Sequence, residues 1–267
     1  SFDETVREKI KFVAPDDDIN YTIMGMLILE QFGSSFTHDN IRELWVKHLP
    51  LDTTFGPERT MLIKSGLESL GRMNLASFGE TGGVASSEDG YRPTFFRGVN
   101  KINRFLNPGD ELCGAVIRAD AYGYACPGYP AKAAELAWND ASFTHNRTGI
   151  YGTMFVAAAI AMAQVSKDRM DIFDIALKFV PMRSRFYERV RKCFELVSDS
   201  RSWEEGYKKI NDLYGDYGHC RIYQEIGMLI NTLKFANDVG DGICIQVSQG
   251  ADTDSFGASA GSILGAY

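Results

Sequence analysis

The sequence predicts an all-α protein, and three observations carry this prediction. Apolar residues recur at helical spacing along most of the chain. No convincing run of alternating apolar and polar residues marks a β-strand. The run MFVAAAIAMA at 154–163 is small and apolar, as is typical of a helix buried at the centre of a fold. We therefore expect a compact multi-helix single domain spanning residues 1–267.

The first third of the chain is predicted to hold short helices. They are expected at 1–12, from Asp18 to Gly33, at 37–49, 57–70 and 95–106. Gly33 can end the second of these helices, and Thr37 or Asp39 can cap the third. The stretch 73–91 is rich in Gly and Ser and is predicted to be a long loop.

The remainder of the chain is also predicted to be mostly helical. Residues 114–128 mix Gly with aromatic residues and are expected to form a connector. Helices are expected at 129–144, at 150–165, at 221–236, and around IFDIALKFV, SRFYERVRKCFELV and WEEGYKKINDLY within 171–214. Residues 240–252 lead into a last helix, in which Gly257, Gly261 and Gly265 recur every four positions. This spacing predicts a bare helix face on which another backbone packs closely.

Composition narrows the functional class. The chain has 35 acidic and 28 basic residues, for a net charge of −7, so it is a poor candidate for sequence-independent nucleic-acid binding. Its five cysteines are scattered and form no C-x-x-C pair, which indicates neither a disulfide framework nor a zinc knuckle. No signal peptide or membrane-spanning run is visible. We expect a cytoplasmic protein with no membrane partner and no nucleic acid as its primary ligand.

An acidic cluster precedes the first strongly apolar helix. Asp16, Asp17 and Asp18 are adjacent, and three neighbouring carboxylates repel one another. A bound cation or arginine partners would relieve that repulsion, whereas the alternative is a solvated run of charges.

A second acidic cluster lies near the end of the chain. Asp252, Asp254 and Ser255 offer only oxygen ligands, which suit Mg²⁺, Ca²⁺ or Mn²⁺ better than a thiophilic ion. The alternative is a simple N-cap with acidic residues in the first turn of the helix. Taken together, the two clusters lead us to expect that Asp17, Asp18, Asp252 and Asp254 converge on one site.

Three segments in a fixed order give the chain a family resemblance. They are PDDDINYT, GAVIRADAYGYACPGYPAKAAELAWNDASFTHNRTGIYGTMFVAA and GADTDSFGASAGSILGA. Each motif is weak alone, but the ordered set resembles the ADP-ribosylglycohydrolase family, which also includes dinitrogenase-reductase-activating glycohydrolases and J-type crystallins.

The resemblance implies an all-α fold with two Mg²⁺ or Mn²⁺ ions in a central cleft. The residues that match the family's metal ligands are Asp16, Asp17, Asp18, Asp252, Asp254 and Ser255. We expect Asp18 and Asp254 to be the catalytic residues nearest the reacting water. The residues that match substrate-lining segments, and are expected to bind ADP-ribose, are Gly114, Arg118, His145, Gly149 and Tyr151.

The chain departs from the family pattern in two places. The Gly-Asp-x-x-Gly helix with which family members usually begin is absent from this sequence, so we expect the family's N-terminal segment to be missing here. Asp16 also stands where a hydroxyl residue is common, which adds a negative charge to the expected metal site.

The resemblance implies a metal-dependent hydrolase that cleaves the N- or O-glycosidic bond of ADP-ribose. Its partner would be an ADP-ribosylated protein or an ADP-ribosyl small molecule. One alternative is a non-catalytic relative, either a crystallin-like structural protein or an ADP-ribose-binding protein. Another is a helical scaffold that binds a protein through Met and aromatic residues, although such residues at helical spacing usually belong to the core.

Overall fold

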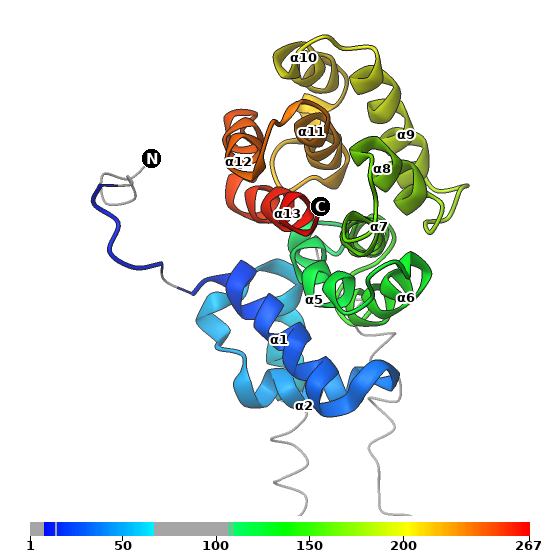
Figure 1. Ribbon diagram of the computed structural model, residues 1–267. Coiled ribbons are helices and arrows are strands. Elements are labelled where there is room, and N and C mark those ends of the chain that lie inside the picture. The colour runs from blue at the N-terminus through cyan, green and yellow to red at the C-terminus, as the bar shows by residue number, and fades with distance from the viewer. Residues whose placement is uncertain (1–7, 14, 67–106, 108) are drawn as a thin grey trace, which may run out of the picture.

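The computed structural model describes residues 8–13, 15–66, 107 and 109–267, and all the regular elements within these ranges are helices (Figure 1). The all-α prediction is therefore confirmed. The α-helices are α1 (Asp17–Phe32), α2 (His38–His48), α5 (Ala119–Tyr124), α6 (Pro130–Ala141), α7 (Thr148–Ala163), α8 (Arg169–Leu177), α9 (Arg185–Ser198), α10 (Trp203–Tyr214), α11 (Ile222–Phe235), α12 (Val239–Ser248) and α13 (Thr253–Ala266). Short 3-10 helices are η2 (Gly33–Ser35), η3 (Leu51–Thr53), η5 (Cys113–Arg118) and η6 (Gly215–Tyr217). Residues 56–66 are also helical.

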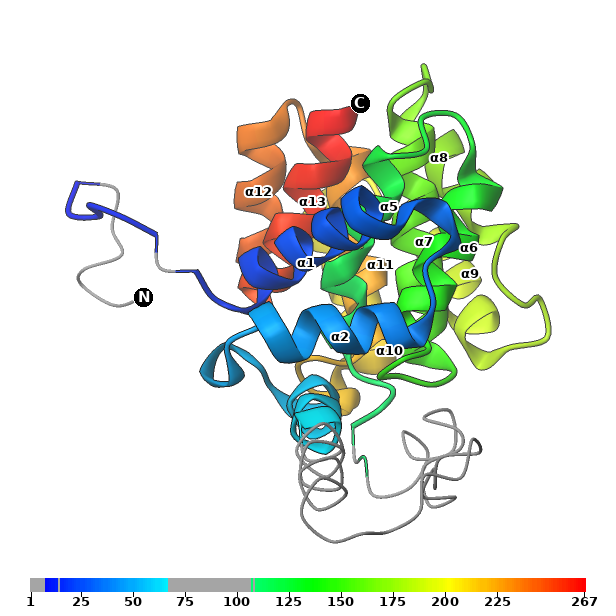
Figure 2. The same ribbon diagram turned by 90° about the horizontal axis from the view of Figure 1, so that it is seen from below.

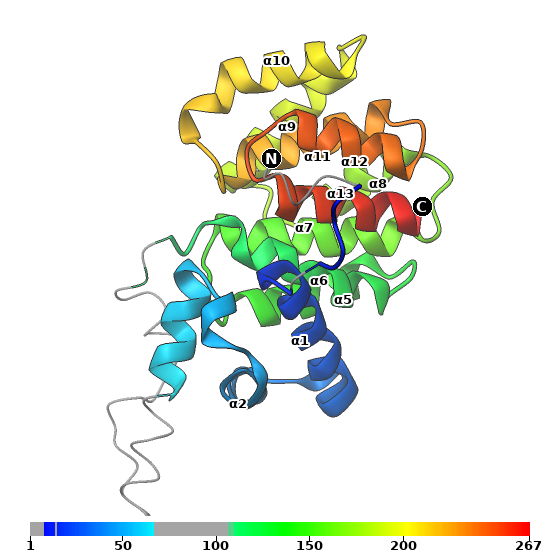
Figure 3. The same cartoon turned by 90° about the vertical axis from the view of Figure 1, so that its left-hand side faces the viewer.

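Helix α7 lies at the centre of the fold, as its composition predicts. It packs against α5, α6, α8 and α13, and Figures 1 and 3 show it between these neighbours. Small residues allow this crowding. At Gly123 of α5, an added Cβ would lie 2.6 Å from the Cβ of Ile160 in α7, which is too close for any side chain. The glycine therefore sets how closely α5 approaches the central helix.

Helices α12 and α13 lie side by side at one edge of the molecule (Figure 2). Gly257 faces the side chain of Val247, and Gly261 faces that of Ile243, both at ordinary or slightly tight contact distance. A Cβ added at Gly265 would meet open space. The expected close backbone approach along all three glycines is therefore wrong. The closest contact between α12 and α13 at a glycine is instead at Gly242 of α12, which makes room for a leucine side chain of α13.

Several predicted helix ends are confirmed. Helix α1 ends at Gly33, whose φ of 64° is a conformation that glycine adopts without steric cost. Helix α2 begins after Thr37, whose side chain accepts a hydrogen bond from the backbone N–H of Asn40. The Asn40 side chain bonds back to the Thr37 backbone N–H, which completes a capping box.

Two predictions about local structure are wrong. The expected connector at 114–128 is largely helical, because η5 and α5 are built from small buried residues whose glycines resemble loop punctuation. Residues 8–12 of the expected first helix form a turn followed by a segment without regular structure. Residues 1–7, 67–70, 73–91 and 95–106, which carry the rest of those predictions, lie outside the described residues.

None of the helices in the described part of the chain combines the length and apolarity needed to cross a bilayer.

Candidate functional site

The two acidic clusters meet where α1 and α13 begin. Carboxylate oxygens of Asp16, Asp18 and Asp254 all lie within 4.8 Å of one another, although the residues come from opposite ends of the chain. Helices α1 and α13 are in contact, which is how the fold brings these residues together (Figure 3). Asp16 also caps α1, because its Oδ1 accepts a hydrogen bond from the backbone N–H of Ile19 at 3.4 Å.

The Asp18 carboxylate is buried without a partner among the described residues. Neither of its oxygens is exposed or hydrogen-bonded to a described residue. Burial raises the pKa of Asp18 to about 8, and the charges of Asp17 and Asp254 add to the effect. Burial raises the pKa of Asp17 to about 6. Orphaned carboxylate oxygens inside a protein are costly unless a cation or donor satisfies them.

Two of the alternatives left open for this cluster, arginine partners and a solvated run of charges, do not fit the described residues. Within the described ranges, no arginine or lysine forms an ion pair with Asp16, Asp17 or Asp18. A solvated run of charges does not fit either, because the Asp18 oxygens are buried. The donors that converge here are all carboxylate oxygens, which Mg²⁺ and Mn²⁺ prefer.

Asp252 occupies the N-cap position of α13 but does not cap the helix with its side chain. Its Oδ2 instead accepts a hydrogen bond from the Sγ of Cys113 at 2.9 Å, and a weaker one from the Sγ of Cys220 at 3.5 Å. The interpretation of Asp252 as a simple N-cap is therefore wrong. The carboxylate also contacts Asp254, so it lies between the acidic cluster and the two thiols.

Asp254 and Ser255 complete the second cluster. Although burial acts to raise the pKa of Asp254, hydrogen bonds from Asp252 and from the backbone N–H of Ser255 lower it below its usual value. Ser255 is 6% exposed, and its hydroxyl contacts the Asp252 carboxylate. A bound divalent cation would keep Asp254 ionised and would also favour the ionised form of Asp18.

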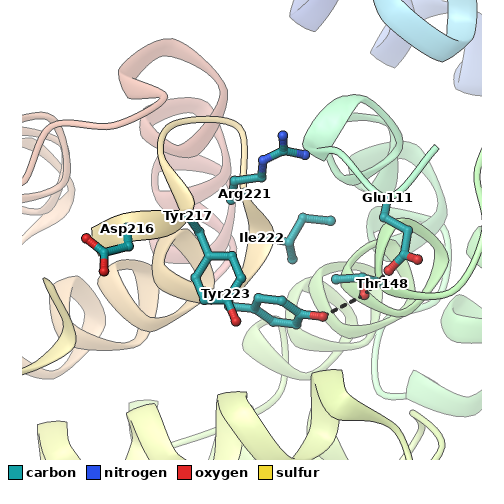
Figure 4. Close-up of a pocket in the computed structure, with 7 residues that line it drawn as sticks. All are labelled: Glu111, Thr148, Asp216, Tyr217, Arg221, Ile222 and Tyr223. Atoms are coloured by element: carbon teal, nitrogen blue, oxygen red, sulfur yellow. Dashed lines mark hydrogen bonds between the residues drawn. The ribbon is translucent and has the colours of Figure 1, made fainter. Parts of the chain in front are cut away.

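A cavity of about 330 Å³ opens beside the start of α11 (Figure 4). It is lined by Glu111, Thr148, Asp216, Tyr217, Arg221, Ile222 and Tyr223. The Tyr223 hydroxyl lies 3.0 Å from Oγ1 of Thr148, and Figure 4 shows this pair forming one side of the cavity. Arg221 is exposed and forms no salt bridge with a described residue, so its guanidinium is available to a ligand.

The cavity is linked along the chain to a residue that contacts the second acidic cluster. Arg221 directly follows Cys220, whose thiol contacts Asp252. Sequence reasoning missed this cavity. The available signal was the stretch YGDYGHCRIY at 214–223, in which aromatic residues, glycines and an arginine gather between two helices.

A comparison with protein families identifies the family of this chain. A family model for ADP-ribosylglycohydrolase matches residues 15–267. The chain belongs to the ADP-ribosylglycohydrolase family. No curated protein matches the chain. Membership in this glycohydrolase family confirms the resemblance seen in the sequence and supports hydrolase activity on ADP-ribosylated substrates.

The residues that match the family's substrate-lining segments do not line the cavity at α11. Arg118 is 1% exposed, and its guanidinium pairs with Oε1 of Glu58 at 2.7 Å and with Oδ2 of Asp140 at 2.6 Å. The same guanidinium lies over the ring of Trp45. Its donors are therefore used inside the core, where the charge balances two buried carboxylates.

His145 is part of the same buried network. It is fully buried, and its Nδ1 lies 2.7 Å from Oγ1 of Thr144 and 3.4 Å from Oε1 of Glu58. Burial lowers the pKa of His145 well below 6.5, and the nearby Arg118 lowers it further, so the ring is neutral. This position does not support the direct contact with ADP-ribose that we expected.

The other three expected ADP-ribose residues are packed against neighbouring side chains. A Cβ at Gly114 would collide with the carboxylate of Glu58, and one at Gly149 would collide with the ring of His145. Tyr151 is half-buried and packs edge-on against Phe186. None of the five lines the cavity at α11, although Thr148, the neighbour of Gly149, does.

Proposed function

We propose that this family member is a divalent-cation-dependent hydrolase that cleaves the glycosidic bond between ADP-ribose and a protein side chain or small molecule. The observation that carries the proposal is the meeting of Asp16 and Asp18 with Asp254, together with the buried, unpartnered oxygens of Asp18. A purely structural protein would gain nothing from this arrangement, because unpaired buried carboxylates destabilise a fold.

The carboxylate donors fit two hard cations, Mg²⁺ or Mn²⁺. The residues that would hold them are Asp16, Asp17, Asp18, Asp252, Asp254 and Ser255. When bound, such ions polarise ribose hydroxyls and make a water more acidic at neutral pH.

The chain's own residues then supply orientation and charge. Asp18 and Asp254 are the carboxylates best placed to orient the attacking water toward the anomeric carbon and to accept its proton, since their oxygens lie close together in the cluster. As the bond to the leaving group breaks, positive charge develops on the sugar, and the surrounding carboxylates stabilise it. The acceptor leaves with the electron pair of the broken bond and takes up a proton.

The cavity at α11 supplies a place for the rest of the ADP-ribosyl group. Arg221 is suited to pair with the diphosphate, because guanidinium binds phosphate oxygens in a bidentate fashion. The ring of Tyr217 lines the same cavity and is 41% exposed, although the guanidinium of Arg189 lies over it at 5.0 Å, and its exposed part offers a surface for the adenine. Whether the enzyme cleaves a bond to nitrogen or to oxygen of the acceptor depends on the side of the site opposite the cavity at α11.

A cytoplasmic location is part of the proposal. All five cysteines are free, which agrees with a reducing compartment.

Release of ADP-ribose from arginine-linked, serine-linked and small-molecule conjugates tests this function. We expect turnover with Mg²⁺ or Mn²⁺ that EDTA abolishes and added Mg²⁺ restores. Activity that survives EDTA would overturn cation dependence. Protein that binds ADP-ribose and Mn²⁺ but cleaves none of the three conjugates would instead favour the non-catalytic ADP-ribose-binding alternative.

A further inference from the structure

Two cysteines and an aspartate converge beside the acidic cluster. Cys113 is the first residue of η5, Cys220 precedes α11, and Asp252 precedes α13. The two Sγ atoms and a carboxylate oxygen of Asp252 all lie within 4.8 Å of one another. Oδ2 of Asp252 is the shared point, at 2.9 Å from Sγ of Cys113 and 3.5 Å from Sγ of Cys220.

A buried glutamate holds two of these segments together. Oε1 of Glu225 accepts hydrogen bonds from the backbone N–H of Cys220 at 2.8 Å and from that of Asp252 at 3.2 Å. Glu225 is 1% exposed, and its second oxygen is buried with no described partner. Outer residues of this kind fix metal ligands in place and typically account for about 10- to 100-fold in metal affinity. Cys220 and Asp252 are therefore positioned before any ion arrives.

We propose that Cys113, Cys220 and Asp252 form a binding site for a thiophilic divalent ion, with Zn²⁺ as the natural occupant. Two thiolates select Zn²⁺ or Cd²⁺ over Mg²⁺, which prefers oxygen ligands. Zn²⁺ binds sulfur at about 2.3 Å and carboxylate oxygen at about 2.0–2.2 Å in a tetrahedron, which places neighbouring ligand atoms roughly 3.5–3.8 Å apart. The spacing within 4.8 Å agrees with such a site after small adjustments.

The site is reachable from solvent. Cys113 is buried, but Cys220 and Asp252 are both partly exposed. With three protein ligands, the fourth position is left for water or another ligand, as is usual for zinc sites that are not purely structural.

The shared aspartate has a regulatory consequence that rests on the proposed function. Asp252 contacts Asp254, so the same carboxylate belongs to the oxygen cluster and to the thiol pair. An ion held by the two thiolates would draw Asp252 away from the hard cations. Micromolar Zn²⁺ is then expected to inhibit the hydrolase, and excess Mg²⁺ is expected to oppose that inhibition.

Cadmium titration tests the site directly, because cadmium–thiolate bonds absorb in the ultraviolet. The full chain, kept reduced with a phosphine, is titrated with Cd²⁺ in the presence of Mg²⁺. We expect a thiolate band that saturates at one Cd²⁺ per chain. Cys113→Ser and Cys220→Ser should each lose most of the band and weaken binding by more than about 100-fold, beyond the cost of an outer-residue change.

Cys244→Ser is the matched control, because Cys244 is exposed on α12 and remote from the two thiols in sequence. It should bind Cd²⁺ as the wild type does. A band that persists in Cys113→Ser or Cys220→Ser, or that disappears in Cys244→Ser, would overturn the site. Circular dichroism shows that each variant is folded, and Asp252→Asn offers a second probe because it leaves both thiols in place and should weaken Cd²⁺ binding. A correct Cd²⁺ result in a protein that hydrolyses no ADP-ribosyl conjugate would refute only the proposed function.

Discussion

A carboxylate oxygen of Asp18, in the first described helix, lies within 4.8 Å of one of Asp254, in the last. Both oxygens of Asp18 are buried without a described partner, so the fold leaves a polar group unsatisfied at this point. Such an arrangement is typical of a site that a cation completes. The predictions below depend on this pair and on the side chains around it.

Asp18→Asn should stabilise the cation-free protein at pH 8. Burial raises the pKa of Asp18 to about 8 from an ordinary value of 3.8. The folded state therefore holds this proton more tightly than the unfolded state, and stability is lost as pH rises from about 4 to about 8. Asparagine cannot ionise, so the variant escapes that loss.

Thermal unfolding in EDTA across this pH range measures the effect. We expect the variant to melt at least about 2 °C higher than the wild type at pH 8, with the difference vanishing near pH 4. Equal melting temperatures at pH 8 would show that Asp18 is not under electrostatic stress.

Asp254→Asn should abolish turnover while leaving the fold intact. Asparagine keeps the size and one oxygen of the side chain but removes the charge that, in the proposed mechanism, holds a divalent cation and stabilises a cationic sugar. The loss of turnover rate should exceed the roughly 100- to 1000-fold loss caused by removing one hydrogen-bond donor from a catalytic site. Asp212→Asn is the control, because Asp212 is an exposed residue paired with Lys208. Wild-type activity in Asp254→Asn would remove this residue from the mechanism.

Arg118→Met should destabilise the protein by about 3–5 kcal/mol, because it leaves Glu58 and Asp140 buried without their partner. Urea unfolding measures this free energy, and Arg183→Met is the control at an exposed position. A change below about 1 kcal/mol would contradict a structural role for Arg118 and reopen its assignment to the substrate.

Arg221→Ala should weaken ADP-ribose binding by at least about tenfold, the cost of losing one hydrogen bond to a charged group. Calorimetry with ADP-ribose measures the change. Arg183→Ala, at an exposed position outside the cavity, should bind as the wild type does. Unchanged affinity in Arg221→Ala would place the diphosphate elsewhere.

The sequence was sufficient to predict the helical fold and the meeting of its two acidic clusters. The small, apolar composition of α7 identified it as central, and carboxylates at two helix starts indicated a common site. Both signals are local, because each depends on residues close together in the chain.

Long-range partners could not be predicted in this way. Cys113 and Cys220 are isolated in sequence, and only the fold brings both to Asp252. Arg118 lies in a segment that resembles a substrate-binding motif, yet burial beside Glu58 makes it part of the core. Pairing and burial of this kind depend on how helices pack, which neither motif nor spacing records.

Calorimetric titration with Mn²⁺ tests the central claim most directly. If Asp18 and Asp254 hold the same ions, Asp18→Asn and Asp254→Asn should each lower the affinity for Mn²⁺. The double variant should bind Mn²⁺ only slightly less tightly than the weaker-binding of the two single variants. Asp212→Asn should bind Mn²⁺ as the wild type does. Wild-type affinity in either single variant, or losses that simply add in the double variant, would contradict a shared cation site built from both ends of the chain.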